Sequence, residues 1–239
     1  MTPLSNKTAL ITGATKGMGA AIAEKLAQNG YNLLLCARDT HALNRVKHQL
    51  EQTYPAIYVT TYPVDFSQKQ QVHDLAEQAT AQKDAIDILV NNVGIYRPVS
   101  VLDETAEDYE AQMQVNYYTT YHLCQAIGRV MRKNRSGHIF NISSIASRSP
   151  VATAGTYTVT KYAIRGLTQV LRDELRPYGV RVTEIVPGST LTSSWEGTTI
   201  PADRFVLPED IAQAILTCLR VSEGANVDEL VVTPRYGNI

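Results

Sequence analysis

The chain of 239 residues is 44% hydrophobic and 19% charged, which favours one α/β domain over residues 1–239 with a core large enough to offset the lost conformational entropy. Its 22 basic and 23 acidic residues are well mixed and give a net charge of −1, so we expect a small-molecule substrate, no nucleic-acid partner and no membrane partner. Cys36, Cys124 and Cys218 form no metal-binding pattern and no apolar run is long enough for a leader or a membrane span, which predicts a cytoplasmic protein without a metal site.

Short apolar runs alternate along the chain with longer amphipathic stretches, which is the pattern of repeated βαβ units. Each short run is apolar on both faces and bounded by turn residues, as buried parallel strands are. Strands are predicted at 7–12, 32–37, 57–63, 86–91, 137–142, 180–186 and 228–232. Helices are predicted at 18–29, 40–53, 68–82, 106–134, 155–177 and 209–220. The expected fold is α/β, a single Rossmann-like doubly wound parallel sheet of seven strands with helices on both faces.

The first predicted strand runs directly into the glycine-rich segment TGATKGMG, residues 12–19, and a helix follows. Glycines spaced GxxxGxG let the backbone approach a pyrophosphate, and the first turn of the helix offers free N–H groups to that anion. An ordinary glycine-rich turn is the alternative, but the strand before and the helix after favour a dinucleotide site. The segment supplies six predicted coenzyme contacts, which are Gly13, Thr15, Lys16, Gly17, Met18 and Gly19.

The end of the second strand indicates which dinucleotide is bound. An NAD enzyme usually places a carboxylate there on the ribose 2′-hydroxyl, and Ala37 cannot make that hydrogen bond. Arg38 can pair with a 2′-phosphate, and Lys16 can reach the same group from the glycine loop. The two cations could instead lie on a solvated rim, and Asp39 could reach the ribose by itself. We predict NADP(H), preferred over NAD(H).

Two more segments end at the same carboxyl edge of the predicted sheet, where ligands bind in such folds. Asp65 and Phe66 follow the third strand, and Asn92 and Gly94 follow the fourth within the sequence NNVG. Asp65 suits the adenine amino group, although it could also cap the next helix. All four residues are predicted to bind the coenzyme.

Tyr157 and Lys161 are four residues apart in a predicted helix, so both side chains project from one face. Ser144 ends the fifth strand. An adjacent ammonium should lower the phenol pKa from its usual value of about 10, which would make Tyr157 an acid/base. In a reduction Tyr157 would protonate the carbonyl oxygen while Ser144 holds that oxygen by a hydrogen bond. A YxxxK pair also arises by chance in many helices, so the catalytic interpretation depends on its occurrence together with the glycine loop in the same chain.

Asn116 lies within the long helix predicted over 106–134. Asn116 could anchor a water that resupplies the proton, and Lys161 could also hold the nicotinamide ribose hydroxyls. Alternatively, Asn116 is a polar residue that kinks the helix.

In their order, TGATKGMG, NNVG, Asn116, Ser144, the Tyr157-x-x-x-Lys161 pair and Pro187-Gly188 resemble the motif set of the short-chain dehydrogenase/reductase family, over nearly the whole chain. The resemblance implies a catalytic tetrad of Asn116, Ser144, Tyr157 and Lys161. It adds nicotinamide contacts from Pro187, Gly188 and Thr192, which matches the threonine of the family's PGxxxT, and Tyr157 and Lys161 also serve the coenzyme. A homodimer or homotetramer packed through helices 106–134 and 155–177 is expected by the same resemblance.

Within the family the chain is most similar to 3-oxoacyl-ACP reductases and carbonyl reductases. Three features depart from that pattern: Val93 replaces the alanine of NNAG, Asp228-Glu229-Leu230 replaces VDGG, and the tail 236–239 is distinct. Arg135 matches one carrier-docking arginine of these reductases, but Tyr178 stands where the second would be. The basic cluster 129–135 could equally stabilise a helix end.

The predicted substrate loop, about 189–207, carries Leu191, Trp195, Ile200 and Phe205. These side chains could close an apolar lid over the site, or pack within the loop. The resemblance places Tyr96, Arg148 and Tyr162 near the pocket. We predict an enzyme that uses NADPH to reduce a 3-oxoacyl thioester, ketone or aldehyde; the alternative is a coenzyme-binding sensor or scaffold with little turnover.

Overall fold

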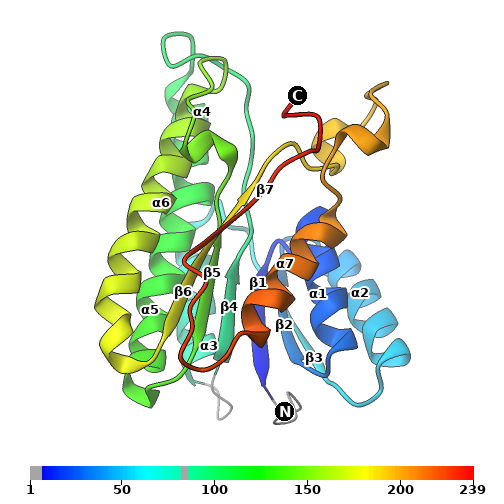
Figure 1. The fold of residues 1–239 in the computed structure, drawn as a ribbon, viewed down its shortest axis with the longest axis vertical. Coiled ribbons are helices and arrows are strands. Elements are labelled where there is room, and N and C mark those ends of the chain that lie inside the picture. The colour runs from blue at the N-terminus through cyan, green and yellow to red at the C-terminus, as the bar shows by residue number, and fades with distance from the viewer. Residues whose placement is uncertain (1–6, 82–85) are drawn as a thin grey trace.

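The computed structural model describes residues 7–81 and 86–239. The segment 1–6, which was examined for a leader, and the last residue of the helix predicted over 68–82 lie outside the described residues. The strands are β1 Thr8–Thr12, β2 Asn32–Ala37, β3 Val59–Pro63, β4 Ile86–Asn91, β5 His138–Ile142, β6 Arg181–Pro187 and β7 Glu229–Val232. They form one parallel sheet in the order β3-β2-β1-β4-β5-β6-β7 (Figure 1). The Rossmann-like fold predicted from the sequence is confirmed.

Helices cover both faces of the sheet (Figure 1). One layer contains α1 Gly17–Gln28, α2 Thr40–Thr53 and α7 Pro208–Arg220. The other layer contains α3 Lys69–Ala81, α5 Thr119–Asn134 and α6 Gly155–Leu175. A short helix, α4 Ala106–Gln112, precedes α5, and a 3₁₀ turn, Arg176–Tyr178, follows α6. Because every crossover is a helix, the carboxyl ends of all strands meet at one edge of the sheet.

Two hydrophobic cores explain why the strands are almost continuously apolar. In β1, Ala9 and Ile11 pack into the core shared with α1, α2 and α7, whereas Leu10 packs into the core shared with α3 and α5. All three side chains are fully buried. Burying one Leu or Ile contributes about 1.5–3 kcal/mol, so successive residues pointing to opposite faces stabilise both layers.

The helix predicted as continuous over 106–134 is interrupted. A π-helical segment, Met113–Tyr118, lies between α4 and α5 and contains Asn116. The Asn116 amide is hydrogen-bonded to the backbone of Ile95 instead of projecting freely. The Thr120 hydroxyl donates to the Asn116 carbonyl at 3.0 Å. The structure thus places Asn116 in a π-helical turn, and turns of this kind are frequent at functional sites.

The chain end returns to the carboxyl edge of the sheet. After β7 the tail bends back over the start of the loop 189–207, the predicted substrate loop (Figure 1). Ser189 N–H donates to Asn238 Oδ1 at 3.1 Å, and the Ile239 N–H donates to Ser189 Oγ at 3.0 Å. Within the described part of the chain, no helix combines the length and apolar character needed to cross a membrane.

Candidate active site

The glycine loop between β1 and α1 is shaped to receive an anion. Gly13 and Gly17 have φ angles of +66° and +50°, which side chains rarely allow. A Cβ on Gly19 would lie 2.2 Å from the Gly13 carbonyl oxygen, so only glycine fits there. Lys16 begins α1 without a side-chain cap, and the first turn holds no acidic residue. The free N–H groups and positive end of α1 are thus left for a ligand.

The loop is fastened to β4 by a threonine that the sequence analysis did not single out. Thr12 Oγ1 accepts from the backbone N–H groups of Asn92 and Val93 at 2.9 and 3.0 Å. Asn92 Nδ2 donates to the Thr12 carbonyl at 2.8 Å. The amide of Asn92, predicted to bind the coenzyme, is thereby engaged in holding the loop. Its part in the site is to fix the cradle.

At the end of β2 the structure gives different surroundings to Arg38 and Asp39, the two charged residues that could contact the ribose end of the coenzyme. Asp39 caps α2, accepting from Ala42 N–H at 2.9 Å, and this hydrogen bond holds the pKa of its carboxyl below the usual range. Arg38 is exposed and forms no ion pair with any described residue. Ala37 is buried. The cation at this edge is available to a ligand, whereas the carboxylate serves the helix.

Asp65 and Phe66 lie after β3 with part of their bonding capacity already used. Asp65 Oδ1 accepts from the N–H and hydroxyl of Ser67 at 3.0 and 2.8 Å, which lowers the pKa of the carboxyl. These hydrogen bonds form a local turn with Ser67 before α3 begins at Lys69, and they occupy one carboxylate oxygen. The Phe66 side chain is buried in the second core, so only its backbone is open to a coenzyme contact.

Ser144, Tyr157 and Lys161 come together at the carboxyl edge. Ser144 follows β5 and caps the short 3₁₀ turn Ile145–Ser147, accepting from Ala146 N–H at 3.1 Å. Tyr157 and Lys161 project from α6, and a hydrogen bond joins Tyr157 to Ser144. Lys161 Nζ lies 5.5 Å from the centre of the Tyr157 ring and donates to the Ile142 carbonyl at 3.1 Å.

The pKa of Tyr157 is shifted in the direction opposite to the one predicted. Burial raises it above its usual value, and Tyr96, whose ring packs edge-on at 4.9 Å, adds to the rise, while the hydrogen bond with Ser144 opposes it. Burial lowers the pKa of Lys161 to about 8. The expectation that the ammonium would dominate was wrong because both groups lose hydration on the same helix face.

Asn116 and Gly94 complete the cluster from another side. The Asn116 Nδ2 donates to the Ile95 carbonyl at 3.0 Å and to Thr160 Oγ1 at 3.2 Å, so its orientation is fixed. A Cβ on Gly94 would lie 3.4 Å from Asn116 Oδ1 and 3.8 Å from Lys161 Nζ. Gly94 therefore leaves open the space beside the lysine and links the NNVG segment to the tetrad.

Thr192 brings the loop 189–207 to the glycine loop, and Gly188, just before that loop, meets the C-terminal tail. Thr192 Cγ2 lies 3.1 Å from the position of a Cβ on Gly17, which brings the predicted PGxxxT threonine to the cradle. A Cβ on Gly188 would lie 2.2 Å from Asn238 Oδ1, so this glycine admits the C-terminal tail. Only the long-range fold reveals this contact, which the sequence analysis missed.

The apolar residues of the substrate loop pack partly against one another. Trp195 and Phe205 meet edge-on with ring centres 4.9 Å apart, and Phe205 is buried. Thr190 pairs with Val206, so the loop closes at its base. Of the side chains expected near the pocket, Arg148 is turned to an ion pair with Glu229, whereas Tyr96 lies against Tyr157.

Glu184 is a buried acid that the sequence analysis passed over. It lies in β6 with no exposed surface, and its Oε1 accepts from Ser147 Oγ at 3.2 Å. Its Oε2 has no hydrogen-bond partner among the described residues. Its charge raises the pKa of Lys161 and so opposes part of the effect of burial. The sequence did contain a signal for a buried acid at this position, because Glu184 is the one charged residue in the otherwise apolar run VTEIVP.

The chain thus combines a seven-stranded parallel sheet, a glycine cradle and a cluster of Ser144, Tyr157 and Lys161 at one edge. A family model described as short chain dehydrogenase matches residues 7–200, and the chain belongs to this family. An uncharacterized oxidoreductase of Staphylococcus saprophyticus subsp. saprophyticus is 36% identical over 234 residues, covering 98% of this chain and 100% of the relative.

Two solved structures share the fold. A metagenomic short-chain oxidoreductase in complex with NADP has a TM-score of 0.84 and 29% identity, covering 97% of this chain and 98% of the other. An alcohol dehydrogenase from the archaeon Thermococcus sibiricus, complexed with 5-hydroxy-NADP, has a TM-score of 0.89 and 27% identity, with 98% of each chain covered. No metal-binding group of three or more His, Cys, Asp or Glu side chains occurs among residues 7–81 and 86–239.

Proposed function

We propose that the protein is an NADPH-dependent reductase that converts a carbonyl group to an alcohol, with Tyr157 as the proton donor. The observation that carries the proposal is the cluster of Ser144, Tyr157 and Lys161 beside the glycine cradle, with the phenol hydrogen-bonded to the serine. The raised pKa of Tyr157 keeps the phenol protonated near neutral pH, as a donor must be. The alcohol dehydrogenase from T. sibiricus supports the reaction class.

The residues at the carboxyl edge fit NADPH. The uncapped start of α1 and the glycines at 13, 17 and 19 would hold the pyrophosphate. Arg38, exposed and without an ion pair among the described residues, would hold the 2′-phosphate, with Lys16 nearby. Asp39 is used as a helix cap, which favours NADP(H) over NAD(H). NADP in the metagenomic relative supports the same coenzyme.

When bound, the coenzyme supplies the hydride, and the protein supplies the proton and the geometry. Tyr157 gives its phenol proton to the carbonyl oxygen of the substrate, and Ser144 stabilises that oxygen with a hydrogen bond. Both residues are held by rigid elements, Ser144 at the end of β5 and Tyr157 on α6. In the reverse direction, Tyr157 would take the proton back from an alcohol.

Lys161 and Asn116 return a proton to Tyr157 after each turnover. Lys161 lies against the phenol ring with a pKa of about 8, so its ammonium can release a proton near neutral pH. The Asn116 amide is fixed by Ile95 and Thr160 at the side of Gly94. In the proposal, Asn116 anchors a water that reprotonates the lysine, which also holds the nicotinamide ribose.

A 3-oxoacyl thioester, a ketone or an aldehyde is the proposed substrate. The apolar pair Trp195 and Phe205 and the exposed ring of Tyr96 favour a carbonyl compound with an apolar part. Docking of an acyl carrier protein is less favoured, because Arg135 donates to the Pro177 carbonyl at 3.2 Å and lies 5.9 Å from the Tyr178 ring centre. That arginine is thus already used to close the end of a helix.

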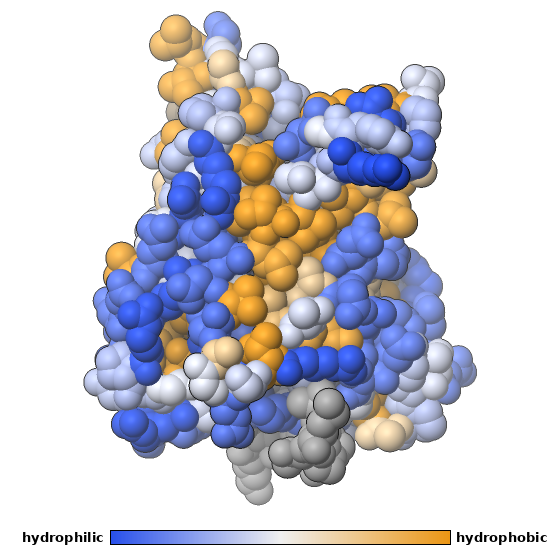
Figure 2. Space-filling view, in the orientation of Figure 1, coloured by the Kyte–Doolittle hydropathy of each residue, from blue (hydrophilic) through white to orange (hydrophobic). Residues whose placement is uncertain are grey.

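The proposed assembly is a homodimer or homotetramer. On α6, Val159 and Val170 are 51% and 56% exposed, although valine side chains usually pack inside. Figure 2 shows a further apolar band between the two helical layers over β7, where Val231 is 46% exposed. A second copy would cover these surfaces. Light scattering on the purified protein tests the assembly, and a monomer at all concentrations would reject it.

The function is tested by following NADPH absorbance with acetoacetyl thioester, ketones and aldehydes. The wild type is expected to reduce at least one carbonyl, and Tyr157→Phe to lose about 100-fold or more in kcat. Tyr178→Phe, which removes a phenol hydroxyl in the 3₁₀ turn after α6, is the matched control and is expected to retain wild-type activity. If NADPH binds but the wild type reduces none of these carbonyls, the proposal fails in favour of a coenzyme sensor.

A further inference from the structure

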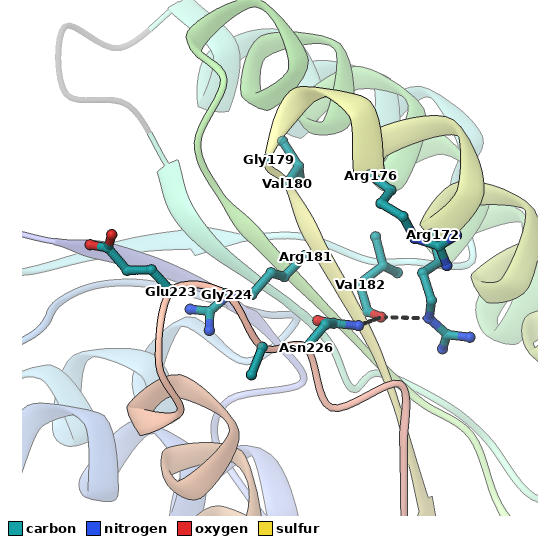
Figure 3. Close-up of a pocket in the computed structure, with 10 residues that line it drawn as sticks. Arg172, Arg176, Gly179, Val180, Arg181, Val182, Glu223, Gly224 and Asn226 are labelled. Carbon is teal, nitrogen blue, oxygen red and sulfur yellow. Dashed lines mark hydrogen bonds between the residues drawn. The ribbon is translucent and has the colours of Figure 1, made fainter.

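Strand β7, from which the tail 233–239 continues, is fastened at its start. Asn226 Nδ2 and Arg172 Nε both donate to the Val182 carbonyl of β6, at 3.4 and 3.0 Å. Figure 3 shows these two side chains meeting at that carbonyl, beside the cavity where β6 begins. Arg172 also lies 3.5 Å from the Asp228 carboxylate. Because donors from α6 and from the segment before β7 share one acceptor on β6, the position of β7 against the sheet is fixed.

The other end of β7 places the tail beside the segment predicted to contact the nicotinamide. Val232, the last residue of β7, lies opposite Pro187 in the parallel register, and its carbonyl accepts from the Gly188 N–H at 2.8 Å. A Cβ on Gly188 would lie 2.9 Å from Pro234 Cδ, and Pro234 is buried. The tail thus crosses the chain at the point where β6 passes into the loop 189–207.

Ser189 joins the tail to both limbs of the loop 189–207. Its N–H donates to Asn238 Oδ1 at 3.1 Å, and its Oγ accepts from the Ile239 N–H at 3.0 Å. Its carbonyl accepts from the Val206 N–H at 3.0 Å, which closes the loop at its base. The same residue is therefore bonded to the tail on one side and to the returning limb of the loop on the other.

A tight turn at Gly237 directs Asn238 to this position. The Gly237 N–H donates to the Pro234 carbonyl at 3.0 Å, and φ at Gly237 is +87°, a conformation that side chains rarely allow. The turn brings Asn238 Oδ1 so close to Gly188 that a Cβ there would lie 2.2 Å from it. The contact between Asn238 and Ser189 therefore depends on a glycine on each side.

The loop that the tail holds lies against the glycine cradle. Thr192 Cγ2 lies 3.1 Å from the position of a Cβ on Gly17. Between Ser189 and Thr192, the buried Thr190 donates from Oγ1 to the Gly188 carbonyl at 3.0 Å. A continuous series of contacts thus runs from the tail through Ser189 to the cradle. Fixing such a loop before a ligand arrives reduces the ordering cost that binding would otherwise carry.

We propose that Asn238 is a positioning residue for the coenzyme: by accepting from the Ser189 N–H, it holds the segment 187–192 in place to contact the nicotinamide end. Because the contact of this segment with the nicotinamide belongs to the proposed function, the role of Asn238 rests on that function. Asn238 acts on one end of the coenzyme and Arg38 on the other. Loss of Asn238 should therefore weaken the whole coenzyme and leave unchanged a fragment that ends at the adenosine.

The test is calorimetric titration of the intact protein with NADPH and, separately, with adenosine 2′,5′-bisphosphate, which carries the 2′-phosphate and no nicotinamide. Asn238→Leu is similar in size and lacks the acceptor. It is expected to weaken NADPH about threefold to tenfold, because one hydrogen bond between neutral groups is lost, and to leave the bisphosphate unchanged. Asn238→Asp keeps an acceptor at Oδ1 and is expected to restore the wild-type affinity for NADPH.

Asn29→Leu is the matched control. Asn29 lies at the end of α1, at the opposite edge of the sheet, and its Oδ1 accepts from Arg220 at 2.6 Å. This variant loses an exposed hydrogen bond of the same kind and is expected to bind both ligands as the wild type does. Melting curves establish that each variant is folded.

Arg38→Gln distinguishes failure of the coenzyme proposal from failure of the role of Asn238. If the wild type does not bind NADPH, or if Arg38→Gln weakens neither ligand, the proposed coenzyme is wrong and the role of Asn238 falls with it. If Arg38→Gln weakens NADPH while Asn238→Leu binds it as tightly as the wild type, only the role of Asn238 is overturned. Equal weakening of NADPH in Asn238→Leu and Asn238→Asp, or of both ligands in Asn238→Leu, would overturn it as well.

Discussion

Replacing Lys161 with methionine should separate stability from activity. Lys161 is only 5% exposed, and burial lowers its pKa from 10.5 to about 8. That difference corresponds to about 3 kcal/mol by which the folded state disfavours the charged amine. Methionine has a similar length and no charge, so it removes this penalty together with the hydrogen bond to the Ile142 carbonyl. The lost hydrogen bond offsets part of the gain at neutral pH.

The pH dependence isolates the charge effect, because the lost hydrogen bond remains lost at every pH. The folded protein has the lower pKa, so between pH 8 and 10.5 the unfolded chain binds more protons at Lys161. Wild-type stability therefore rises with pH through this window relative to Lys161→Met. Between pH 7 and pH 10 the difference in unfolding free energy is expected to change by about 2–3 kcal/mol in favour of the wild type.

Guanidinium unfolding of both proteins across this pH range measures the change, and groups common to both cancel. Lys133→Met, at an exposed position on α5, is the control and should show no such pH dependence. Carbonyl reduction by Lys161→Met is expected to be lost under all conditions. A difference in unfolding free energy that stays constant from pH 7 to pH 10 would refute the reasoning that the buried charge of Lys161 destabilises the folded protein.

Three further predictions concern the coenzyme and the proton. Arg38→Gln should weaken NADPH about tenfold or more and leave NADH unchanged in equilibrium binding, and equal effects on both would contradict the phosphate role. Gly19→Ala should abolish tight NADPH binding, because the new Cβ would lie 2.2 Å from the Gly13 carbonyl oxygen. Gly166→Ala is the control: a Cβ there would meet no atom within 4 Å, so the substitution should raise the free energy of unfolding by about 1 kcal/mol. The rate of reduction should fall as pH rises through about 8, where Lys161 loses its proton; a flat profile up to pH 10 would reject that proton path.

The parts of the site that could be predicted depend on local order in the chain. Tyr157 and Lys161 share a helix face because they are four residues apart, and Ser144 follows a recognisable strand. The glycine cradle could be predicted from the spacing of its glycines, because a strand, a glycine turn and a helix follow one another directly in the sequence. These features need no knowledge of which strands are neighbours.

The parts that escaped prediction depend on contacts between distant segments. Thr12 fastens the glycine loop only because β1 lies beside β4, some eighty residues later in the chain. The π-helical segment at Asn116 preserves the apolar period well enough that one long helix was predicted. The direction of the Tyr157 pKa shift depends on burial, which the packing of Tyr96 helps to produce. Spacing along the sequence contains none of this information.

The most direct test of the account is a single-turnover reaction with NADPH in which both hydrogens at C4 of the nicotinamide are replaced by deuterium. The enzyme is mixed with this coenzyme and a carbonyl substrate from the assay panel, and the product is examined by mass spectrometry. The account predicts deuterium on the alcohol carbon with the wild type and its loss with Tyr157→Phe. An alcohol formed without deuterium, or undiminished transfer in Tyr157→Phe, would contradict it.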